Sequence, residues 1–276
     1  MSIHDTNDTN DTISRGAAWL AALTRNAEPL PGYPASVRVV DAPLAGDPAR
    51  YLAVLPDPHN RFTRARTGEV GLLEAWQLAR AVRQVVLEDR ALAVKRPIVA
   101  VIDVASQAYG RREEAYGIHQ ALAGAAGAYA EARLAGHPVI GLIVGKAMSG
   151  AFLAHGYQAN RLIALDDPGV MVHAMGKASA ARITLRSVEA LEALAETVPP
   201  MAYDIRNYAT LGLLWQTLSV AQPDQPSDGD LAIVAASLRA ALADIRADPE
   251  RGLAGRLGAP HRQASATVRE MLKQQW

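Results

Sequence analysis

Two transitions from a buried strand to a helix lie close together in the middle of this 276-residue chain, and they constrain its fold more than any other feature. The first runs from a strand at 97–103 through a turn to a helix at 111–135, and the second runs from a strand at 139–144 into a helix within 145–154. The unbroken apolar run at 98–101 is typical of a parallel strand that is covered on both faces. The pattern therefore predicts an α/β protein in which both strands end at one crevice.

The remaining segments are expected to form a scaffold around this pair. Two strands, at 37–40 and 51–55, precede it, and two more, at 161–165 and 170–172, follow it. Apolar spacing and capping residues predict the other helices. These lie at 14–24, at 68–90, from 177 to about 182, at 187–196, from Ser227 through Ile245, and at 261–275. A broken helical stretch is expected at 203–215.

The N-terminal residues are expected to be disordered, unlike the rest of the chain. Residues 5–12 repeat Asp-Thr-Asn, a polar, low-complexity composition that predicts a disordered tail over 1–13. No sharp shift in composition interrupts the rest, so we expect a single domain over 14–276.

Composition excludes several kinds of site. The chain has no cysteine, so disulfides, thiolate catalysis and cysteine-ligated metals are excluded. Its net charge is zero and it has no long basic run, so neither nucleic acid nor a membrane surface is expected as a partner. No signal peptide and no apolar run of about 18 residues are present, which predicts a cytoplasmic protein without a transmembrane helix. The histidines show no metal-ligand spacing, so no metal site is expected.

The first turn, at 104–110, is a candidate site because free N–H groups at the start of a helix favour negative charge. Gly110 lets the backbone approach a ligand without a Cβ atom, and Tyr109 can cover the pocket. Gln107 is a secondary candidate in the same turn. Glu114 is a candidate acid or base, although the helix dipole alone also favours a carboxylate there. Taken alone, such a turn is more often only a connection.

The second turn, at 145–152, again leads from a strand into a helix. It is not a phosphate-binding P-loop, because no Gly-Lys-Ser/Thr sequence closes it. The functional interpretation is an oxyanion pocket formed by the N–H groups near Gly150 and Ala151, where one donor contributes about 3–4 kcal/mol in the transition state. The structural alternative is close packing of the helix on the sheet.

Three side chains near the second turn are further candidates. Ser149 is a candidate by its place at the small-residue step, but no activating base marks it as a nucleophile. Lys146 can attract a carboxylate or be an ordinary exposed lysine. His155, one helical turn after Gly150, is a further secondary candidate.

Together the two turns resemble the carboxyltransferase branch of the crotonase superfamily. In that branch a strand-borne Asp is followed by a glycine loop, an acidic helix start, and a Gly-Gly-Ala-aromatic step. The residues that carry the resemblance are Asp103, Gly110, Glu114, Gly117, the small-residue helix ending at 129–132, and the step at 149–152. Ser149 departs from the first glycine of that step, and Ala105-Ser106 replaces the usual Pro-Gly.

Outside these turns, further segments are similar to one family within the branch, the gamma subunits of biotin-independent malonate decarboxylases. They are 57–62, 68–71, 145–155, 173–182 and 211–218. The resemblance covers nearly the whole chain after the tail. It implies a crotonase-type ββα superhelix with flanking helices.

The resemblance also implies a function. The chain would pair with a homologous beta subunit and decarboxylate a malonyl thioester, held on the prosthetic arm of an acyl-carrier subunit, to acetyl thioester and CO2. An acyl-transferase alpha subunit would recharge the carrier. The chain itself would bind no cofactor, and biotin is not expected. The family's division of labour puts the thioester pocket on the beta subunit, so the pocket near 109–110 and 150–151 would face the departing carboxylate.

Two alternatives stay open at this point. The chain could be half of a biotin-dependent acyl-CoA carboxyltransferase, or a catalytically silent scaffold that completes the fold of its partner. Hydration, another reaction of the superfamily, is disfavoured because Phe152, Leu153 and His155 occupy the place where a hydratase has its second glutamate.

Overall fold

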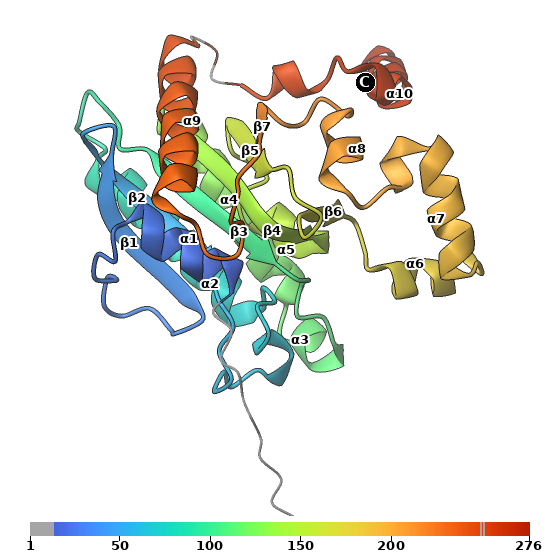
Figure 1. Ribbon diagram of the computed structural model, residues 1–276, viewed down its shortest axis with the longest axis horizontal. Helices are drawn as coiled ribbons and strands as arrows, with labels where there is room; N and C mark the ends of the chain where they lie inside the picture. Colours follow the sequence, from blue (N-terminus) through green and yellow to red (C-terminus); the bar gives the residue numbers. More distant parts are fainter. Residues whose placement is uncertain (1–13, 249, 251) are drawn as a thin grey trace, which may run out of the picture.

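One twisted sheet organises the molecule (Figure 1). The computed structural model describes residues 14–276 except 249 and 251, so the predicted tail over 1–13 lies outside the described residues. The strand order is β1-β2-β3-β4-β5-β7, and β6 pairs with the end of β4. The strands are β1 (Val37–Leu44), β2 (Asp47–Val54), β3 (Ile98–Val104), β4 (Val139–Met148), β5 (Arg161–Leu165), β6 (Met171–His173) and β7 (Gln216–Leu218).

The pairing explains why both faces of the sheet are buried. β1 and β2 form an antiparallel hairpin, whereas all later pairs are parallel. Parallel strands need crossover connections, and these put helices on the two faces. β3 and β4 lie in the middle, and every residue of β3 except Asp103 is buried.

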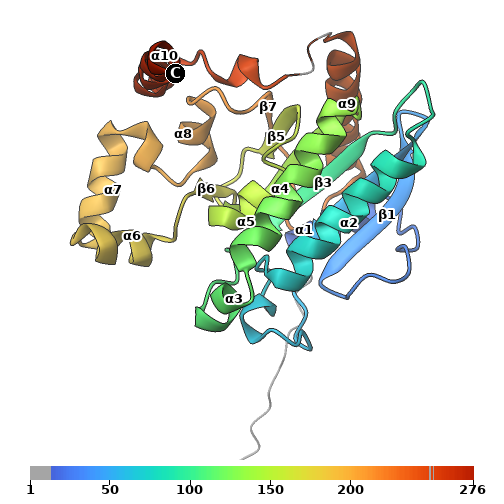
Figure 2. The same cartoon turned by 180° about the vertical axis from the view of Figure 1, so that it is seen from behind.

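Helices cover both faces of the sheet. They are α1 (Arg15–Leu23), α2 (Leu72–Glu88), α3 (Arg111–Ala115), α4 (Ile118–Leu134), α5 (Ser149–Ala154), α6 (Lys177–Thr184), α7 (Val188–Thr197), α8 (Ile205–Ala209), α9 (Asp228–Ala247) and α10 (Gln263–Gln275). α1 and α9 lie on the face seen in Figure 1, and α2, α4 and α5 lie on the face seen in Figure 2. The predicted α/β class is confirmed.

Two helix starts follow their predicted caps. The Ser14 side chain accepts a hydrogen bond from the backbone N–H of Ala17 and opens α1. Ser227 and Asp230 form a capping box at the start of α9, in which the side chain of each residue accepts a hydrogen bond from the backbone N–H of the other. Such caps satisfy amides that have no partner inside the helix.

The predicted helix over 111–135 is wrong in one respect, because it is two helices. Gly117 has a φ of +82° and separates α3 from α4. This left-handed conformation suits glycine and ends the α3 turn. Gly124 serves packing, as expected: a Cβ atom there would lie 2.9 Å from the Trp76 ring on α2.

Trp76 lies at one of the helically spaced apolar positions that predict α2. Its side chain is nevertheless 48% exposed. The ring covers Gly124 on the outer side of the α2–α4 contact, while Ala75 and Leu78 point into the core. The missing side chain at Gly124 leaves the space that the ring occupies on the outside of the two helices.

The second turn lies further along the chain than predicted. β4 continues through Gly145 to Met148, and α5 starts only at Ser149. β6 pairs with residues 146–148 and thereby extends the strand. Gly145 is needed there because a Cβ atom would overlap the carboxylate of Asp103.

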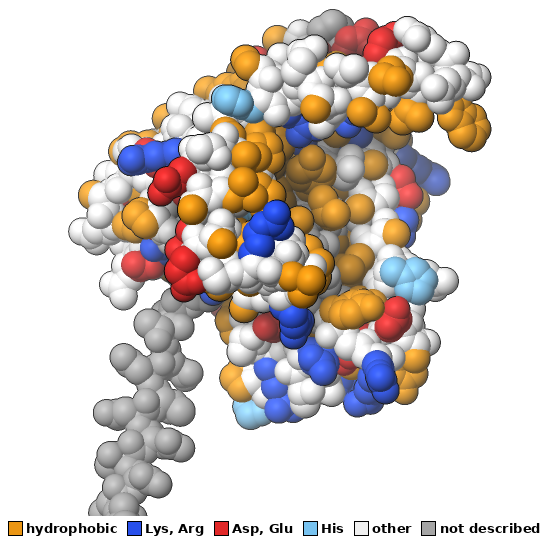
Figure 3. All heavy atoms as spheres, turned by 90° about the vertical axis from the view of Figure 1, so that its right-hand side faces the viewer, with side chains coloured by type: hydrophobic (Ala, Val, Ile, Leu, Met, Phe, Trp, Pro, Cys, Tyr) orange, Lys and Arg blue, Asp and Glu red, His pale blue; other side chains and the backbone are white. Residues whose placement is uncertain are grey.

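Helices α6 and α7 project from the body and have a small hydrophobic cluster of their own, formed by Ala180, Ala181 and Leu191. The side of the molecule that carries α6, α7 and α10 is hollowed, and hydrophobic side chains gather there (Figure 3). Leu185, the residue after α6, and Met271 of α10 are exposed. Among the described helices, none combines the length and apolar character needed to cross a membrane.

Candidate functional site

The candidate site lies where β3, β4 and β6 end, because their parallel pairing brings the carboxyl ends of all three strands to one edge. The loop after β3 is held there by backbone contacts on both sides of Gln107. The N–H of Val70 donates to Ser106 O at 3.0 Å, and the N–H of Ala108 donates to Val70 O at 2.9 Å. This loop, unlike most, is fixed by sheet-like hydrogen bonds.

Asp103 ties three elements together at this edge. Its carboxylate accepts from the N–H of Gly16 in α1 at 3.1 Å and from the N–H of Lys146 in β4 at 3.1 Å. The strand-borne Asp of the sequence pattern therefore has a structural role: it sets the distance between β3, β4 and α1. The side chain of Lys146 itself is exposed at the same edge.

The oxyanion interpretation requires a free N–H at Gly150, but in the structure this N–H is engaged. It donates to Oε1 of Gln107 at 2.7 Å. The two predicted turns are thus in direct contact, and the secondary candidate Gln107 stands between the Gly150 amide and the crevice. The sequence could not reveal this contact, because it joins residues 43 positions apart.

Ser149 adopts a left-handed backbone with a φ of +58°. This conformation costs a residue with a side chain about 1–2 kcal/mol relative to glycine. The family pattern has glycine at this position, so the structure explains the pattern and shows that this chain carries the strain. Ser149 and Gly150 are half-buried, while Ala151 is fully buried in the first turn of α5.

Gly110 is buried and extended, with a φ of −172°. A Cβ atom there would lie 2.5 Å from both Arg64 and Glu113, whose side chains approach each other to 3.8 Å. Glu114, the predicted candidate acid, is exposed on α3, and its neighbour Glu113 is the buried carboxylate. Tyr109 is 57% exposed at the mouth of the turn.

His155 is the one predicted candidate that the structure moves away from the edge. Its ring is fully buried beneath α5, with Nδ1 3.0 Å from the Tyr129 hydroxyl and Nε2 3.0 Å from Val101 O. Burial lowers its pKa to about 4, against a smaller opposing effect of the Val101 carbonyl. Both ring nitrogens are engaged, so the geometry favours a core role over a site role.

His173 takes the place at the edge that His155 was expected to hold. It ends β6 and is paired in register with Met148, the residue before Ser149. Its ring stacks on Tyr203 at 3.8 Å, and Nδ1 lies 2.9 Å from Met175 O. Burial lowers its pKa. The histidines show no metal-ligand spacing in the sequence, so His173 was not predicted; the signal that could have found it is its position at the end of a strand.

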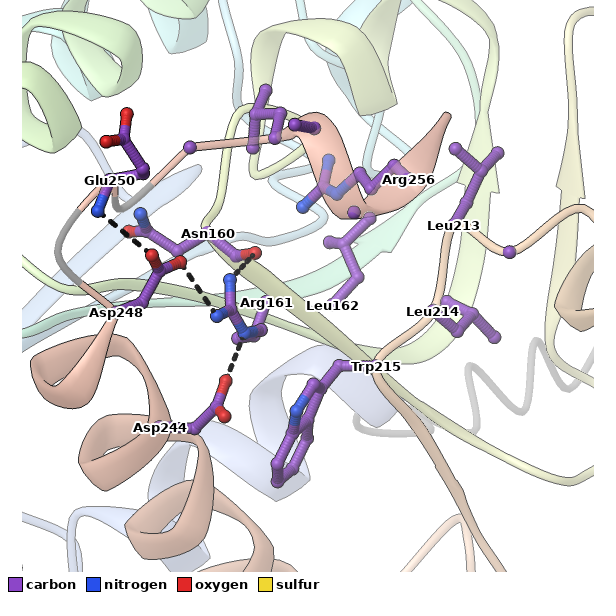
Figure 4. A pocket seen from close by; sticks show the side chains of 15 residues that line it. Asn160, Arg161, Leu162, Leu213, Leu214, Trp215, Asp244, Asp248, Glu250 and Arg256 are labelled. Carbon is purple, nitrogen blue, oxygen red and sulfur yellow. Dashed lines mark hydrogen bonds and ion pairs between the residues drawn. The ribbon is translucent and has the colours of Figure 1, made fainter. Parts of the chain in front are cut away.

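Two cavities bear on the location of the site. One, of about 300 Å³, lies at the strand edge beside Asp103, Gly145 and Lys146. A larger one, of about 570 Å³, lies at the other end of the sheet, where β5 begins (Figure 4). There Arg161 is paired with Asp244 and Asp248, so its charge is already neutralised. Within the described ranges no group of side chains could hold a metal ion.

Comparison with known proteins decides the family. The sequence profile described as malonate decarboxylase gamma subunit matches residues 65–276. A chain of a Pseudomonas malonate decarboxylase hetero-tetramer, solved in complex with coenzyme A, is 68% identical. It superimposes with a TM-score of 0.91 over 95% of this chain and 100% of that chain.

The chain belongs to the malonate decarboxylase gamma subunit family. A second structure, the Pseudomonas malonate decarboxylase MdcD–MdcE hetero-dimer, matches at 64% identity and a TM-score of 0.88 over 95% of this chain and 99% of that one. Transcarboxylase 12S, at 19% identity, has a TM-score of 0.63 over 87% of this chain and 43% of its own. This likeness is evidence for the fold alone. The predicted crotonase-type fold is confirmed.

A curated relative extends the comparison beyond malonate decarboxylases. It is the malonyl-S-ACP:biotin-protein carboxyltransferase MADD of Malonomonas rubra, 37% identical over 147 residues. The match spans 52% of this chain and 50% of that protein, so the chain aligns with only half of this relative's length. The gamma subunit family and the carboxyltransferases therefore share this core.

Proposed function

We propose that this gamma subunit acts with a homologous beta subunit to decarboxylate a malonyl thioester, giving acetyl thioester and CO2. The observation that carries the proposal is the 68% identity, over nearly the whole chain, to a chain of a solved malonate decarboxylase hetero-tetramer. The hetero-dimer of the second relative supports a beta partner. Exposed apolar residues such as Leu185 and Met271 also support a protein partner, since such patches mark interaction surfaces.

The chemistry requires stabilisation of negative charge. Breaking the bond to the carboxylate leaves an enolate on the thioester, and fixed N–H donors in a dry pocket stabilise that enolate. The turns at 109–110 and 149–151 supply the candidate groups of this chain, Tyr109, Gly110, Ser149, Gly150 and Ala151. In our proposal the beta subunit binds the thioester and stabilises the enolate, and the pocket of this chain faces the departing carboxylate and orients it for loss of CO2. The exposed Lys146 is a further candidate at the same strand edge.

The substrate is proposed to reach the site on the prosthetic arm of an acyl-carrier subunit, recharged by an acyl-transferase alpha subunit. The relative named as a malonyl-S-ACP carboxyltransferase supports a carrier-bound malonyl group. The same name includes a biotin protein, which makes biotin-dependent carboxyl transfer the second candidate. We propose that this chain binds no cofactor and does not need biotin.

The decisive experiment measures CO2 release from malonyl-carrier thioester by this chain, by the beta subunit, and by both together. We expect turnover only from the combination, and no change on addition of avidin. Full activity of either subunit alone contradicts the shared site, and inhibition by avidin favours the biotin-dependent alternative.

A variant of Gly150 tests the silent-scaffold alternative. A side chain there would press on Gln107, because even a Cβ atom would lie 3.3 Å from its Oε1. Gly150→Val should therefore lower turnover at least a hundredfold while the complex still assembles. Unchanged turnover in an intact complex supports the scaffold interpretation instead.

A further inference from the structure

The contact between the two turns assigns a role to Gln107. We propose that Gln107 is the hydrogen-bond donor that this chain presents to the reacting malonyl group, and that the Gly150 N–H orients it. The proposal rests on the proposed decarboxylase function. It replaces the backbone N–H of Gly150 by a side-chain amide as the group that meets the substrate.

The direction of the hydrogen bond fixes how the amide points. A backbone N–H can only donate, so the side-chain atom 2.7 Å from Gly150 N is the carbonyl oxygen Oε1 of Gln107. The NH2 group of the same planar amide must then point away from Gly150. In the part of the chain that the structure describes, this NH2 group has no hydrogen-bond partner, and Gln107 is half-buried at the strand edge.

The backbone around Gln107 holds the side chain in place. Its neighbours Ser106 and Ala108 are hydrogen-bonded to Val70, and its own carbonyl accepts from the N–H of Tyr109 at 2.8 Å. Leu122 bounds the contact on the side of α4, lying 3.5 Å from the position of a Cβ atom on Gly150. A donor held in this way loses little freedom on meeting the substrate, which is the condition for effective electrostatic stabilisation.

A second donor stands close by in the same turn. The N–H of Gly110 has no partner among the described residues, and Gly110 follows Gln107 by three positions. The backbone N–H of Gly110 is therefore a second candidate donor of the same turn. The Gly150 N–H adds to this indirectly, because a hydrogen bond to the amide oxygen strengthens the amide as a donor.

The competing interpretation is that Gln107 only occupies the hollow and leaves when substrate binds. Two variants separate these interpretations in the complete complex with the beta and carrier subunits. Gln107→Ala frees the Gly150 N–H, and Gln107→Glu keeps an acceptor for it but removes the donor. Gln120→Ala is the matched control, since Gln120 is an exposed glutamine beside Gly117 on α4.

We expect both variants of Gln107 to lower kcat/KM by about a hundredfold or more, because the donor binds and orients the malonyl group, and the control to be unchanged. Gln107→Ala with equal or higher kcat/KM overturns the assignment. An inactive wild-type complex refutes the proposed function instead, so the two failures are distinct. Comparable thermal unfolding and subunit assembly of the variants show that their fold is intact.

A structure of the complex with a malonyl thioester analogue that cannot lose CO2 gives a readout independent of turnover. We expect Nε2 of Gln107 within hydrogen-bonding distance of an analogue oxygen while Oε1 stays on Gly150. A rotated Gln107, with the Gly150 N–H donating directly to the analogue, overturns the proposal.

Discussion

His155 shows how a single buried ring can define a protonation state. The carbonyl of Val101 can only accept, so Nε2 carries the proton and Nδ1 accepts from the Tyr129 hydroxyl. In this neutral form all polar atoms of the ring are satisfied inside the core. A charged imidazolium could donate from Nδ1 to the Tyr129 hydroxyl, but its charge would lie in the core without water around it, which disfavours the charged form.

This geometry predicts an acid-dependent stability. The pKa of His155 is lowered by burial from 6.5 to about 4, so the unfolded chain binds its proton first as the pH falls. The contribution is complete above about pH 6.5 and is lost progressively down to about pH 4, a change of about 3 kcal/mol. Urea unfolding of wild type and His155→Gln at pH 7 and pH 4.5 should show a smaller acid loss in the variant. Equal losses contradict the prediction.

The strain at Ser149 gives a second prediction at this scale. Ser149→Gly removes the cost of a side chain at a φ of +58° and should raise the free energy of unfolding by about 1 kcal/mol. Ser149→Ala is the matched control, because it removes the hydroxyl but keeps the Cβ atom. If the hydroxyl takes no part in the reaction, both variants keep their turnover; a selective loss in both would show a chemical role for it.

Individual residues of the site were only partly predictable. Gly110 and Gly150 followed from the rule that helix starts after buried strands attract anions, and the structure joins their two turns through the hydrogen bond from Gly150 to Gln107. The hydrogen-bond partner of the Gly150 N–H could not be predicted, because no periodic pattern indicates where the side chain of a loop glutamine points. The same limit hid His173, whose importance depends on the pairing of β6 with β4.

At the scale of elements, local sequence rules predicted where helices start better than where helices are interrupted or strands end. The caps at Ser14 and Ser227 act within three residues, so the sequence contains the whole interaction. The extension of β4 to Met148 depends on β6, more than 20 residues later in the chain. The interruption at Gly117 was missed, because glycine in a helix rich in small residues gives the same pattern whether it packs against a neighbour or ends a turn.

The start of α9 offers a test of this local scale. The buried carboxylate of Asp230 accepts hydrogen bonds from the N–H groups of Ala221, Gln222 and Ser227 and from the Ser227 hydroxyl. Because several donors lose their partner together, Asp230→Ala should cost about 2–3 kcal/mol of stability, measured by chemical denaturation. Asp228→Ala is the control, since Asp228 is exposed in the same turn and should change stability much less.

At the scale of the whole molecule, Arg256 attaches the C-terminal segment to the loop between α5 and β5. Its side chain is buried, with 8% of the residue exposed, and its guanidinium donates to the carbonyls of Tyr157 and Ala159. Burial lowers its pKa to about 10. No carboxylate pairs with it in the described part of the chain, so these two carbonyls carry the attachment.

Arg256→Met should therefore release the end of the chain, because methionine retains apolar bulk but donates no hydrogen bond. We expect a loss of about 2 kcal/mol and faster proteolysis after residue 252, while the sheet stays folded. Arg269→Met on the exposed helix α10 is the control. Unchanged proteolysis of the Arg256 variant would show that other contacts hold the segment.

The separate cluster beneath α6 and α7 has a consequence for how the molecule opens. Ala180, Ala181 and Leu191 are only three buried side chains, so few contacts hold this projection together compared with the sheet. Its backbone amides should consequently exchange with heavy water as one group, well before those of β3 and β4. A partner that covers the projection would slow this exchange selectively, and the hydrogen isotope pattern would map where that partner sits.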